Sequence, residues 1–275
     1  MHAFASGPKR NYYGKAAVVV YRLRRDGTPP PVFGASVTML LYGDEFWATY
    51  TTGDNTGLVA TDSMKNFIQR ETANFAGSDL EAYAQFLAKK FLDKYPQTEG
   101  IQLTAESLPY QGNIALTPAG PERAFAQLEL TRGGPVEMRS GIRGFRLLRT
   151  GGSAFRGFVR DEYTTLPDIA NRPLHMWLDL DWIYTSTETA FSAGSVTSQV
   201  NALVYEVFEN FESGSIQQII YQLGGRILAA QSAIAEVRLE ANNRTWDTVV
   251  EPDDALGIYT EPRPAYGVLG LTLRR

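Results

Sequence analysis

Hydrophobic and polar residues alternate along several short runs of the chain, with the period of two that is typical of half-buried β-strands. In the first half these runs are Lys15 to Arg24, Val32 to Tyr50, Ile101 to Leu108 and Arg123 to Thr131. Gly43-Asp44 interrupts the second run as a turn would, and the first run ends in a loop at Asp26, Gly27 and Pro29 to Pro31. The pattern therefore predicts strands joined by turns and loops.

Two amphipathic helices are predicted between the second and third of these runs. Apolar residues recur at helical spacing from Met64 to Ile68 and again from Leu80 to Phe91. Asp79 is a suitable N-cap for the second helix, and Pro96 ends it because proline cannot continue a helix.

The same order of elements recurs after Gly133-Gly134-Pro135. The predicted strands are Val136 to Arg149, Leu174 to Tyr184, Val237 to Val250 and Tyr266 to Leu273, and the predicted helices are Val196 to Phe211 and Ile216 to Ala235. Residues 1–134 and 135–275 thus form two β-β-α-α-β-β halves of an α+β fold, each with an antiparallel sheet that carries its helix pair on one face. Such sheets leave long edges and apolar surface uncovered, so we expect a homo-oligomer.

Composition narrows the chemistry. The 275 residues are 44% hydrophobic and 20% charged, as in ordinary globular proteins, and the 26 Lys and Arg residues are scattered in a chain of net charge −4. Nothing there indicates nucleic-acid binding. The absence of cysteine excludes thiol nucleophiles, disulfides and Cys-ligated metals, and the two histidines, His2 and His175, make a multi-histidine metal site very unfavourable within one chain.

The chain is expected to be soluble and cytoplasmic. Its longest apolar runs, such as Ala16 to Val20, have the length of strands and fall far short of a membrane span. There is no signal-peptide pattern, and the final Leu-Arg-Arg is not a Ser-Lys-Leu peroxisomal signal. A bacterial source is therefore favoured over a peroxisomal protein.

Two segments of the first half carry polar residues suited to chemistry. Asn11 to Lys15 precedes a strand, and Lys15 is either a solvated lysine or a base, since burial favours the neutral amine. Val59 to Asn66 contains Thr61 and Asp62, either of which could simply be a helix N-cap. A helix N-terminus also offers free N–H groups to an anion.

Two further segments lie in the second half. Phe155 to Leu166, continuing to Arg172, is on its own a charged loop with aromatic residues that could belong to the core. Ser213 to Gln217 stands at a predicted helix start, where the serines suffice as caps and Gln217 could be solvated.

Taken together and in this order, the four segments resemble the urate oxidase (uricase) family. The matching stretches are Tyr13-Gly-Lys15, Val59-Ala-Thr-Asp-Ser-Met-Lys-Asn66 and Arg160-Asp-Glu-Tyr-Thr-Thr-Leu166, and the intervening lengths fit over nearly the whole chain. The resemblance implies two tandem tunnelling-fold (T-fold) halves and a homotetramer that assembles into a barrel. It also implies active sites shared between chains, and oxidation of urate by O2 and water to 5-hydroxyisourate and H2O2 without flavin, haem or metal.

The resemblance also assigns roles to residues of the substrate site. Phe155 would stack on the purine, while Arg172 and Gln217 would hold its polar edge. Thr61 and Asp62 of a neighbouring chain match the residues at the opposite edge of the ring. The other matching residues are Leu166 and Ile216 as pocket walls and Asn242 as the residue that holds dioxygen or water above the ring.

Proton removal in the family runs through lysine, threonine and histidine. Lys15 and Thr61 match the first two, but Arg244 stands where the histidine is expected, two residues after Asn242. An arginine stays protonated and cannot accept a proton as a neutral imidazole does. Neither His2 nor His175 is placed by this alignment to replace it.

Three interpretations remain open. Arg244 could stabilise the urate dianion or a peroxide electrostatically while Lys15 alone acts as base. It could suit a different, more acidic purine-like substrate, or the protein could bind a purine or pterin without oxidising it. The zinc-dependent pterin enzymes of the same fold are excluded, because the chain lacks their Cys and His ligands.

Overall fold

The computed structural model describes residues 4, 6–25, 32–112, 115–192, 196–250 and 256–275. The chain divides into two compact units, Met1–Gly141 with Ile183–Gly194 and Ile142–Trp182 with Ser195–Arg275. Both units combine antiparallel strands with helices, so the α+β class is confirmed. His2 and the predicted loop at Asp26, Gly27 and Pro29 to Pro31 lie outside the described residues.

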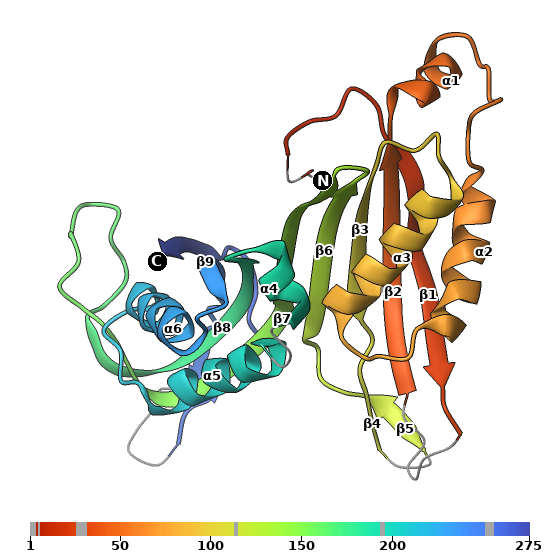
Figure 1. Ribbon diagram of the computed structural model, residues 1–275. Coiled ribbons are helices and arrows are strands. Elements are labelled where there is room, and N and C mark those ends of the chain that lie inside the picture. Colours follow the sequence, from red (N-terminus) through yellow and green to blue (C-terminus); the bar gives the residue numbers. More distant parts are fainter. Residues whose placement is uncertain (1–3, 5, 26–31, 113–114, 193–195, 251–255) are drawn as a thin grey trace. The chain divides into compact units, whose positions relative to one another are not determined.

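The first unit contains the strands β1 (Tyr13–Leu23), β2 (Val32–Tyr42), β3 (Gly100–Ser107) and β6 (Arg123–Thr131). Each pairs antiparallel with the next in that order. The helices α2 (Thr61–Glu71) and α3 (Leu80–Lys94) lie over one face of this sheet, with α2 beside β1 (Figure 1).

The core of this unit lies between the strands and α3. Alternate residues of β2 are fully buried, and Tyr83, Leu87 and Phe91 on α3 are buried as well. The Asp79 side chain accepts a hydrogen bond of 2.8 Å from the Ala82 N–H, which confirms the predicted N-cap.

The second unit contains most of β7 (Gly134–Phe155), together with β8 (Ile169–Tyr184), β9 (Ile234–Asn243) and β12 (Gly267–Arg274). The helices α5 (Val196–Asn210) and α6 (Ile216–Ala230) lie on one face of these strands (Figure 1). Leu174, Met176 and Leu178 on β8 are buried, whereas His175 and Trp177 alternate with them and are only partly covered. The strand period of two therefore places these two side chains on the face without helices.

Several elements differ from the predicted ones. Trp47–Thr51 forms the short helix α1 after a 3₁₀ turn at Asp44–Phe46, so the prediction of a strand continuing to Tyr50 was wrong. Acidic residues in that turn favour a helical start. Helix α6 ends at Ala230 rather than Ala235, because β9 already begins at Ile234. The predicted strand Val237 to Val250 is two strands, because β9 ends at Asn243 and Thr248–Val250 forms the separate short strand β10. The pattern missed α4 (Thr187–Ser192) and the short strands β4 (Tyr110–Gly112), β5 (Leu116–Pro118) and β11 (Ile258–Tyr259).

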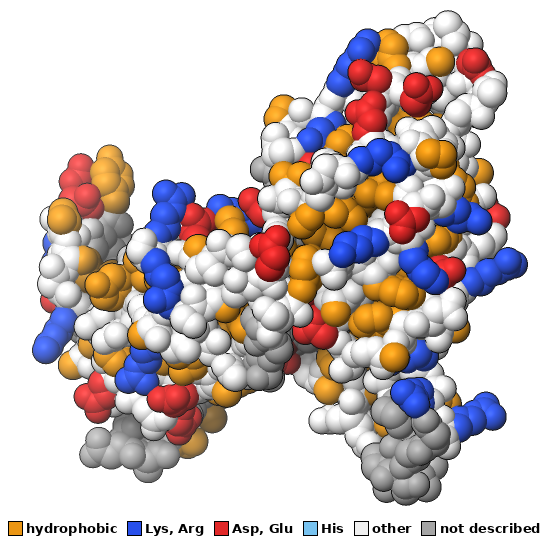
Figure 2. Space-filling model, in the orientation of Figure 1, with side chains coloured by type: hydrophobic (Ala, Val, Ile, Leu, Met, Phe, Trp, Pro, Cys, Tyr) orange, Lys and Arg blue, Asp and Glu red, His pale blue; other side chains and the backbone are white. Residues whose placement is uncertain are grey.

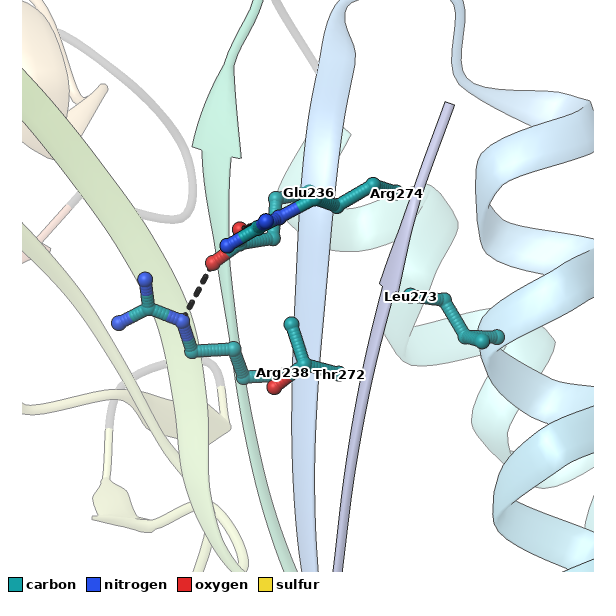
Figure 3. Close-up of a pocket in the computed structure, with 5 residues that line it drawn as sticks. All are labelled: Glu236, Arg238, Thr272, Leu273 and Arg274. Atoms are coloured by element: carbon teal, nitrogen blue, oxygen red, sulfur yellow. Dashed lines mark hydrogen bonds and ion pairs between the residues drawn. The ribbon is translucent and has the colours of Figure 1, made fainter.

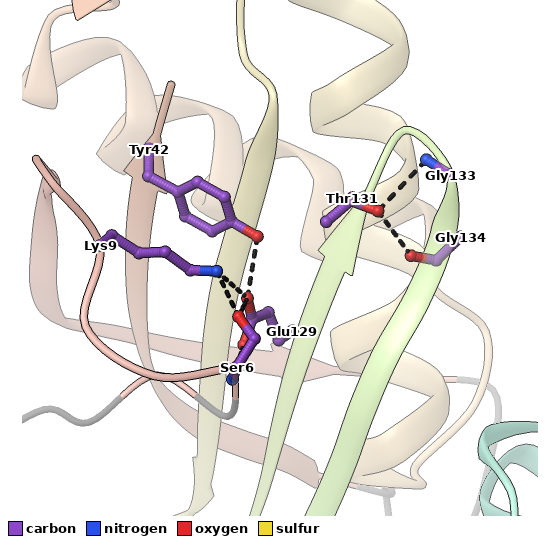
Figure 4. A network of polar contacts seen from close by, with 7 residues as sticks. All are labelled: Ser6, Lys9, Tyr42, Glu129, Thr131, Gly133 and Gly134. Carbon is purple, nitrogen blue, oxygen red and sulfur yellow. Dashed lines mark hydrogen bonds and ion pairs between the residues drawn. The ribbon is translucent and has the colours of Figure 1, made fainter. Parts of the chain in front are cut away.

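A buried carboxylate fixes the segment that leads into β1. The Glu129 side chain is fully buried and accepts hydrogen bonds from the Ser6 and Tyr42 hydroxyls at 2.7 and 2.9 Å. The Lys9 ammonium lies 2.9 Å from the same carboxylate (Figure 4). These contacts hold the chain just before Lys15 against β2 and β6.

A separate loop at Thr131, Gly133 and Gly134 joins β6 to β7 (Figure 4).

A second buried carboxylate, that of Glu81 on α3, accepts hydrogen bonds from the Ser140 and Tyr184 hydroxyls at 2.6 and 2.7 Å. Both bonds go to the same oxygen, Oε1. Burial, followed by the charge of Asp79, raises the pKa of Glu81 above its ordinary value. The folded state therefore favours the protonated form of this group.

We predict that Glu81→Gln stabilises the protein at neutral pH, because glutamine keeps the accepting oxygen and removes the buried charge. Because the pKa of Glu81 is higher in the folded state, protonated Glu81 stabilises the fold at pH values below the unfolded pKa of about 4.3. This stabilisation is lost as the pH rises through the folded-state pKa. The difference in free energy of unfolding between variant and wild type should therefore widen from pH 4 to pH 8 in urea titrations. Glu212→Gln, at an exposed position, is the control; a pH-independent difference would contradict the prediction.

Candidate functional site

The residues of the first unit that the sequence singled out lie where β1 meets the start of α2. The Tyr13 hydroxyl accepts a hydrogen bond of 3.0 Å from the Val59 N–H, which ties the beginning of β1 to the segment before α2. Burial raises the pKa of Tyr13 to about 12, so its hydroxyl stays protonated at neutral pH. Lys15 is partly buried, and its charge lowers the pKa of Asp62 after the larger effect of Lys65. The structure thus brings Lys15 near the first turn of α2.

Helix α2 begins without a side-chain cap. Its N-cap is Ala60, and neither Thr61 nor Asp62 makes a capping hydrogen bond, so the N-cap interpretation of those two residues was wrong. The Asp62 carboxylate instead accepts hydrogen bonds from Lys65 at 2.6 Å and Asn66 at 2.9 Å. The first backbone N–H groups of α2 are left available to an anion.

The strand that carries Lys15 is irregular. The register of β1 against β2 shifts between Lys15 and Val18, and Ala17 has a φ of 54°, in the left-handed region that costs a non-glycine residue energy. A Cβ atom at Gly14 would lie 1.9 Å from the carbonyl oxygen of Met39. Only glycine fits at Gly14, and the bulge begins directly after Lys15.

In the second unit, hydrogen bonds join the end of β7 to the loop before α6. The Ala154 N–H donates to the Ser213 carbonyl at 2.7 Å, and the Ser213 N–H donates to the Gly152 carbonyl at 3.0 Å. The Gly152 N–H also donates to the Asn171 side chain at 2.7 Å. These bonds hold three segments together, namely those that carry Phe155, Arg172 and Gln217.

Phe155 and Arg172 contact each other. The Arg172 guanidinium carbon lies 5.5 Å from the centroid of the Phe155 ring. The Phe158 ring is stacked on the same residue, with centroids 4.9 Å apart and an angle of 15° between the planes. Phe155 therefore stacks on a second aromatic ring, that of Phe158 in the loop after β7.

Arg172 is a partly buried cation whose guanidinium contacts an aromatic ring but has no anionic partner among the described residues. No described residue forms an ion pair with its guanidinium, and its buried Nε lacks a hydrogen-bond acceptor. Burial lowers the pKa of Arg172. A desolvated, uncompensated charge is costly and is characteristic of a site that receives an anion.

Gln217 lies at the start of α6 with its amide unused. Ser215 caps the helix by accepting from the Gln218 N–H at 3.2 Å, and Gln218 in turn accepts from the Gly214 N–H at 2.7 Å. This confirms the serine cap. Gln217 is exposed and makes no side-chain hydrogen bond to any described residue. Its donor and acceptor are both available to a ligand.

Asn242 and Arg244 lie together at the end of β9. An Arg244 guanidinium N–H donates to the Asn242 side-chain oxygen at 3.5 Å. The guanidinium carbon is 3.6 Å from the ring centroids of both Trp177 and Tyr266. Two aromatic faces therefore hold this cation.

The sequence analysis did not place His175, on β8, near Arg244. The Arg244 N–H donates to the His175 carbonyl at 2.9 Å, so the histidine lies across from Arg244 in space although the sequence separates them by 69 residues, 244 minus 175. The register of β8 against β9, which creates this proximity, is not readable from either strand alone.

The remaining predicted site residues lie in the second unit. Leu166 is exposed, and its carbonyl accepts from Arg160 at 3.2 Å, whereas Ile216 is buried at the start of α6. A separate open pocket lies between β9 and β12, where the Glu236 carboxylate bridges Arg238 and Arg274 (Figure 3). None of the predicted site residues lines that pocket.

The charge distribution (Figure 2) and the described helices show no sign of a nucleic-acid surface or of a membrane-spanning helix. In the view of Figure 2, basic and acidic side chains are interspersed on each unit without a single basic face. No helix among the described residues has both the length and the apolar character needed to span a bilayer. The described residues contain no group of three or more His, Cys, Asp or Glu side chains that could hold a metal ion.

In the second unit the structure thus places an aromatic ring beside a partly buried cation, with an exposed amide on a segment held to theirs by hydrogen bonds. Comparisons with known proteins identify the family. The family model for uricase matches residues 11–125 and 138–265. The chain therefore belongs to the uricase family, which confirms the resemblance inferred from the motifs.

Individual relatives agree with this assignment. The chain is 38% identical over 273 residues to the uric acid degradation bifunctional protein PucL of Bacillus subtilis, a match that covers 91% of this chain and 55% of PucL. It is 33% identical to the uricase of Haloferax volcanii over 96% of this chain and 97% of that protein. The crystal structure of a uricase from Bacillus fastidious matches with a TM-score of 0.88 and 32% identity, over 97% of this chain and 94% of that one.

The chain differs in extent from some of these relatives. It spans between half and three fifths of the bifunctional proteins of Bacillus subtilis and Bacillus sp. TB-90, with 55% and 58% of their lengths covered. It spans nearly all of the Haloferax uricase.

We predict that Gly14→Ala lowers the free energy of unfolding by about 1–3 kcal/mol, because the new methyl group collides with the β2 backbone beside Lys15. Gly225→Ala is the matched control, since nothing lies within 4 Å of a Cβ at this exposed position of α6. The control should gain up to about 1 kcal/mol from helix propensity. Equal unfolding midpoints of the Gly14 variant and wild type in urea would contradict the collision.

Proposed function

We propose that this protein is a cofactor-independent urate oxidase, which converts urate, O2 and water to 5-hydroxyisourate and H2O2. The observation that carries the proposal is the partly buried Arg172 beside the Phe155 ring, with the exposed amide of Gln217 held in the same part of the unit. Within the described part of the chain neither side chain has a hydrogen-bond or ion-pair partner. Membership of the uricase family supports the reaction type. Deprotonated urate is electron-rich, so it can transfer electrons to oxygen directly.

The side chains suit a purine anion. An arginine offers parallel N–H donors to an anionic ring, and a primary amide offers one donor and one acceptor to an imide-like edge. In this proposal Phe155 stacks on the ring, Arg172 and Gln217 hold one edge, and Leu166 and Ile216 form the walls. Asn242 holds dioxygen or water above the ring.

The proposed site is completed by a second chain. Lys15, Thr61 and Asp62 belong to the first unit, whereas the other residues belong to the second. We propose tandem T-fold halves, residues 1–134 and 135–275, and a cytoplasmic homotetramer whose barrel brings the first-unit residues of one chain to the second-unit residues of its neighbour. The open start of α2 and Lys15 would then face the opposite edge of the purine.

Arg244 bears on which purine is oxidised. Its guanidinium lies against two aromatic rings and next to Asn242, so it adds positive potential where reduced oxygen would form. A more acidic purine-like substrate is the second candidate, which the same extra cation favours.

Oxygen consumption with peroxide detection tests the proposal. The assay uses metal-free protein, urate and no added cofactor, from pH 6 to pH 10, and the expected result is one H2O2 per O2 consumed. Saturable binding of urate or xanthine without turnover would overturn the oxidase assignment in favour of another substrate or a purine-binding protein.

We predict different effects of Phe155→Ala and Gln217→Ala on substrate selectivity. Loss of stacking costs about 0.5–1.5 kcal/mol for any flat purine, whereas an unmatched polar edge costs about 1–3 kcal/mol and depends on the substituents of the ring. Binding measurements with urate and xanthine should therefore show a larger change of their affinity ratio in the Gln217 variant. Gln218→Ala, which removes an amide used in the helix cap, is the control. Equal losses for both purines in Gln217→Ala would contradict the role of this amide.

A further inference from the structure

His175 lies within the candidate site of the second unit rather than at a distance from it. It is on β8, on the face without helices, and its carbonyl accepts a hydrogen bond of 2.9 Å from the Arg244 N–H. Trp177, two residues further along β8, lies on the same face as His175, and the Arg244 guanidinium carbon is 3.6 Å from the centroid of its ring. His175 therefore projects on the side that also holds Arg244 and Asn242, which are hydrogen-bonded to each other.

The surroundings of the imidazole favour its neutral form. Burial, then the charges of Arg244, the residue directly after β9, and of Arg146 on β7, lower the pKa of His175 below its ordinary value. The ring centroid lies 5.9 Å from that of Trp246, and the buried Nδ1 has no hydrogen-bond partner among the described residues. At neutral pH this imidazole is able to accept a proton.

Arg244 cannot perform that task. A guanidinium carries no acceptor and keeps its proton at any working pH, and this one is held between aromatic rings. His175 is the only histidine in the described part of the chain, and it lies one strand away from Arg244.

We propose that His175 is the residue that shuttles a proton in the oxidation, in place of an imidazole at position 244. The proposal rests on the proposed urate oxidase function. Urate gives two electrons to O2, and water adds to the oxidised ring. His175 takes one proton from that water as the new C–O bond forms and passes it to the peroxide anion, while the second proton of H2O2 comes from a urate N–H. The imidazole is neutral before and after the cycle.

The test compares wild type with His175→Phe, Arg244→His and the double variant, using steady-state urate oxidation from pH 6 to pH 10. His175→Phe should lower kcat at pH 7 by about a hundredfold, the lower end of what a positioned acid–base group contributes, with a KM change of no more than about threefold. The loss should shrink as the pH rises and hydroxide replaces the missing base. The double variant should recover at least tenfold, because it returns an imidazole to the same face, and Arg244→His alone should raise turnover near neutral pH.

Several controls separate proton transfer from a structural role. His2→Phe makes the same change at the other histidine of the sequence and should leave the pH profile unchanged. His175→Gln keeps a polar side chain and guards against misfolding of the phenylalanine variant, which thermal unfolding will reveal. Wild-type kcat with an unchanged pH profile in either His175 variant overturns the proposal, as does failure of the double variant to recover.

A measurement on the unmutated protein does not depend on folding of variants. With two histidines in the sequence, ¹⁵N-histidine NMR gives two imidazoles, and His2→Phe assigns them. Xanthine, added as a ligand that is not turned over, should shift the His175 signals and its titration midpoint; a bound purine that leaves them unchanged overturns the proposal. If wild-type protein oxidises no urate at all, the urate oxidase function fails, whereas turnover without any role of His175 overturns this inference alone.

Discussion

Two backbone hydrogen bonds between β7 and Ser213 determine where the candidate substrate site of the second unit forms. They join the strand that ends in Phe155 to the loop that starts α6, and the Asn171 side chain adds the strand that carries Arg172. Ser153 and Ser213 are almost fully buried at this junction, where larger side chains would separate the backbones. Without these hydrogen bonds, the segments that carry Phe155, Arg172 and Gln217 would not be held next to one another.

Within that corner the polar groups fall into two kinds. Ser215 and Gln218 use their hydrogen-bonding capacity to complete the start of α6, whereas Gln217 and Arg172 leave theirs unused among the described residues. The exposed Gln217 amide is open to solvent, whereas an unpaired N–H at the partly buried Arg172 reduces stability unless a ligand provides the missing partner. Arg172 and Gln217 are thus the side chains of this part of the unit whose hydrogen-bonding groups suit a purine.

The sequence predicted helix caps and single elements better than it predicted which distant residues lie close together in the fold. The Asp79 cap, the serine cap of α6 and most helices and strands follow from residue types over a few positions. The stretch from Trp47 to Tyr50 is helical although its composition favours a strand, because β-propensity describes a half-buried surface and cannot tell whether a neighbouring strand is present. The proximity of Lys15 to the start of α2 was expected only through the family resemblance, since it depends on the packing of β1 against that helix.

The position of His175 likewise could not be predicted from the sequence, because its proximity to Arg244 depends on how two strands pair. Along the sequence, Arg244 leaves the expected proton relay without an imidazole. Across the sheet, an imidazole stands on the adjoining strand, and the same arginine that took the expected place helps to keep it neutral. A cation beside a neutral base suits a reaction in which a proton is removed while negative charge builds up on oxygen, because the cation stabilises the product anion without competing for the proton. Arginine at position 244 is thus compatible with proton transfer, because His175 accepts the proton and Arg244 stabilises the negative charge.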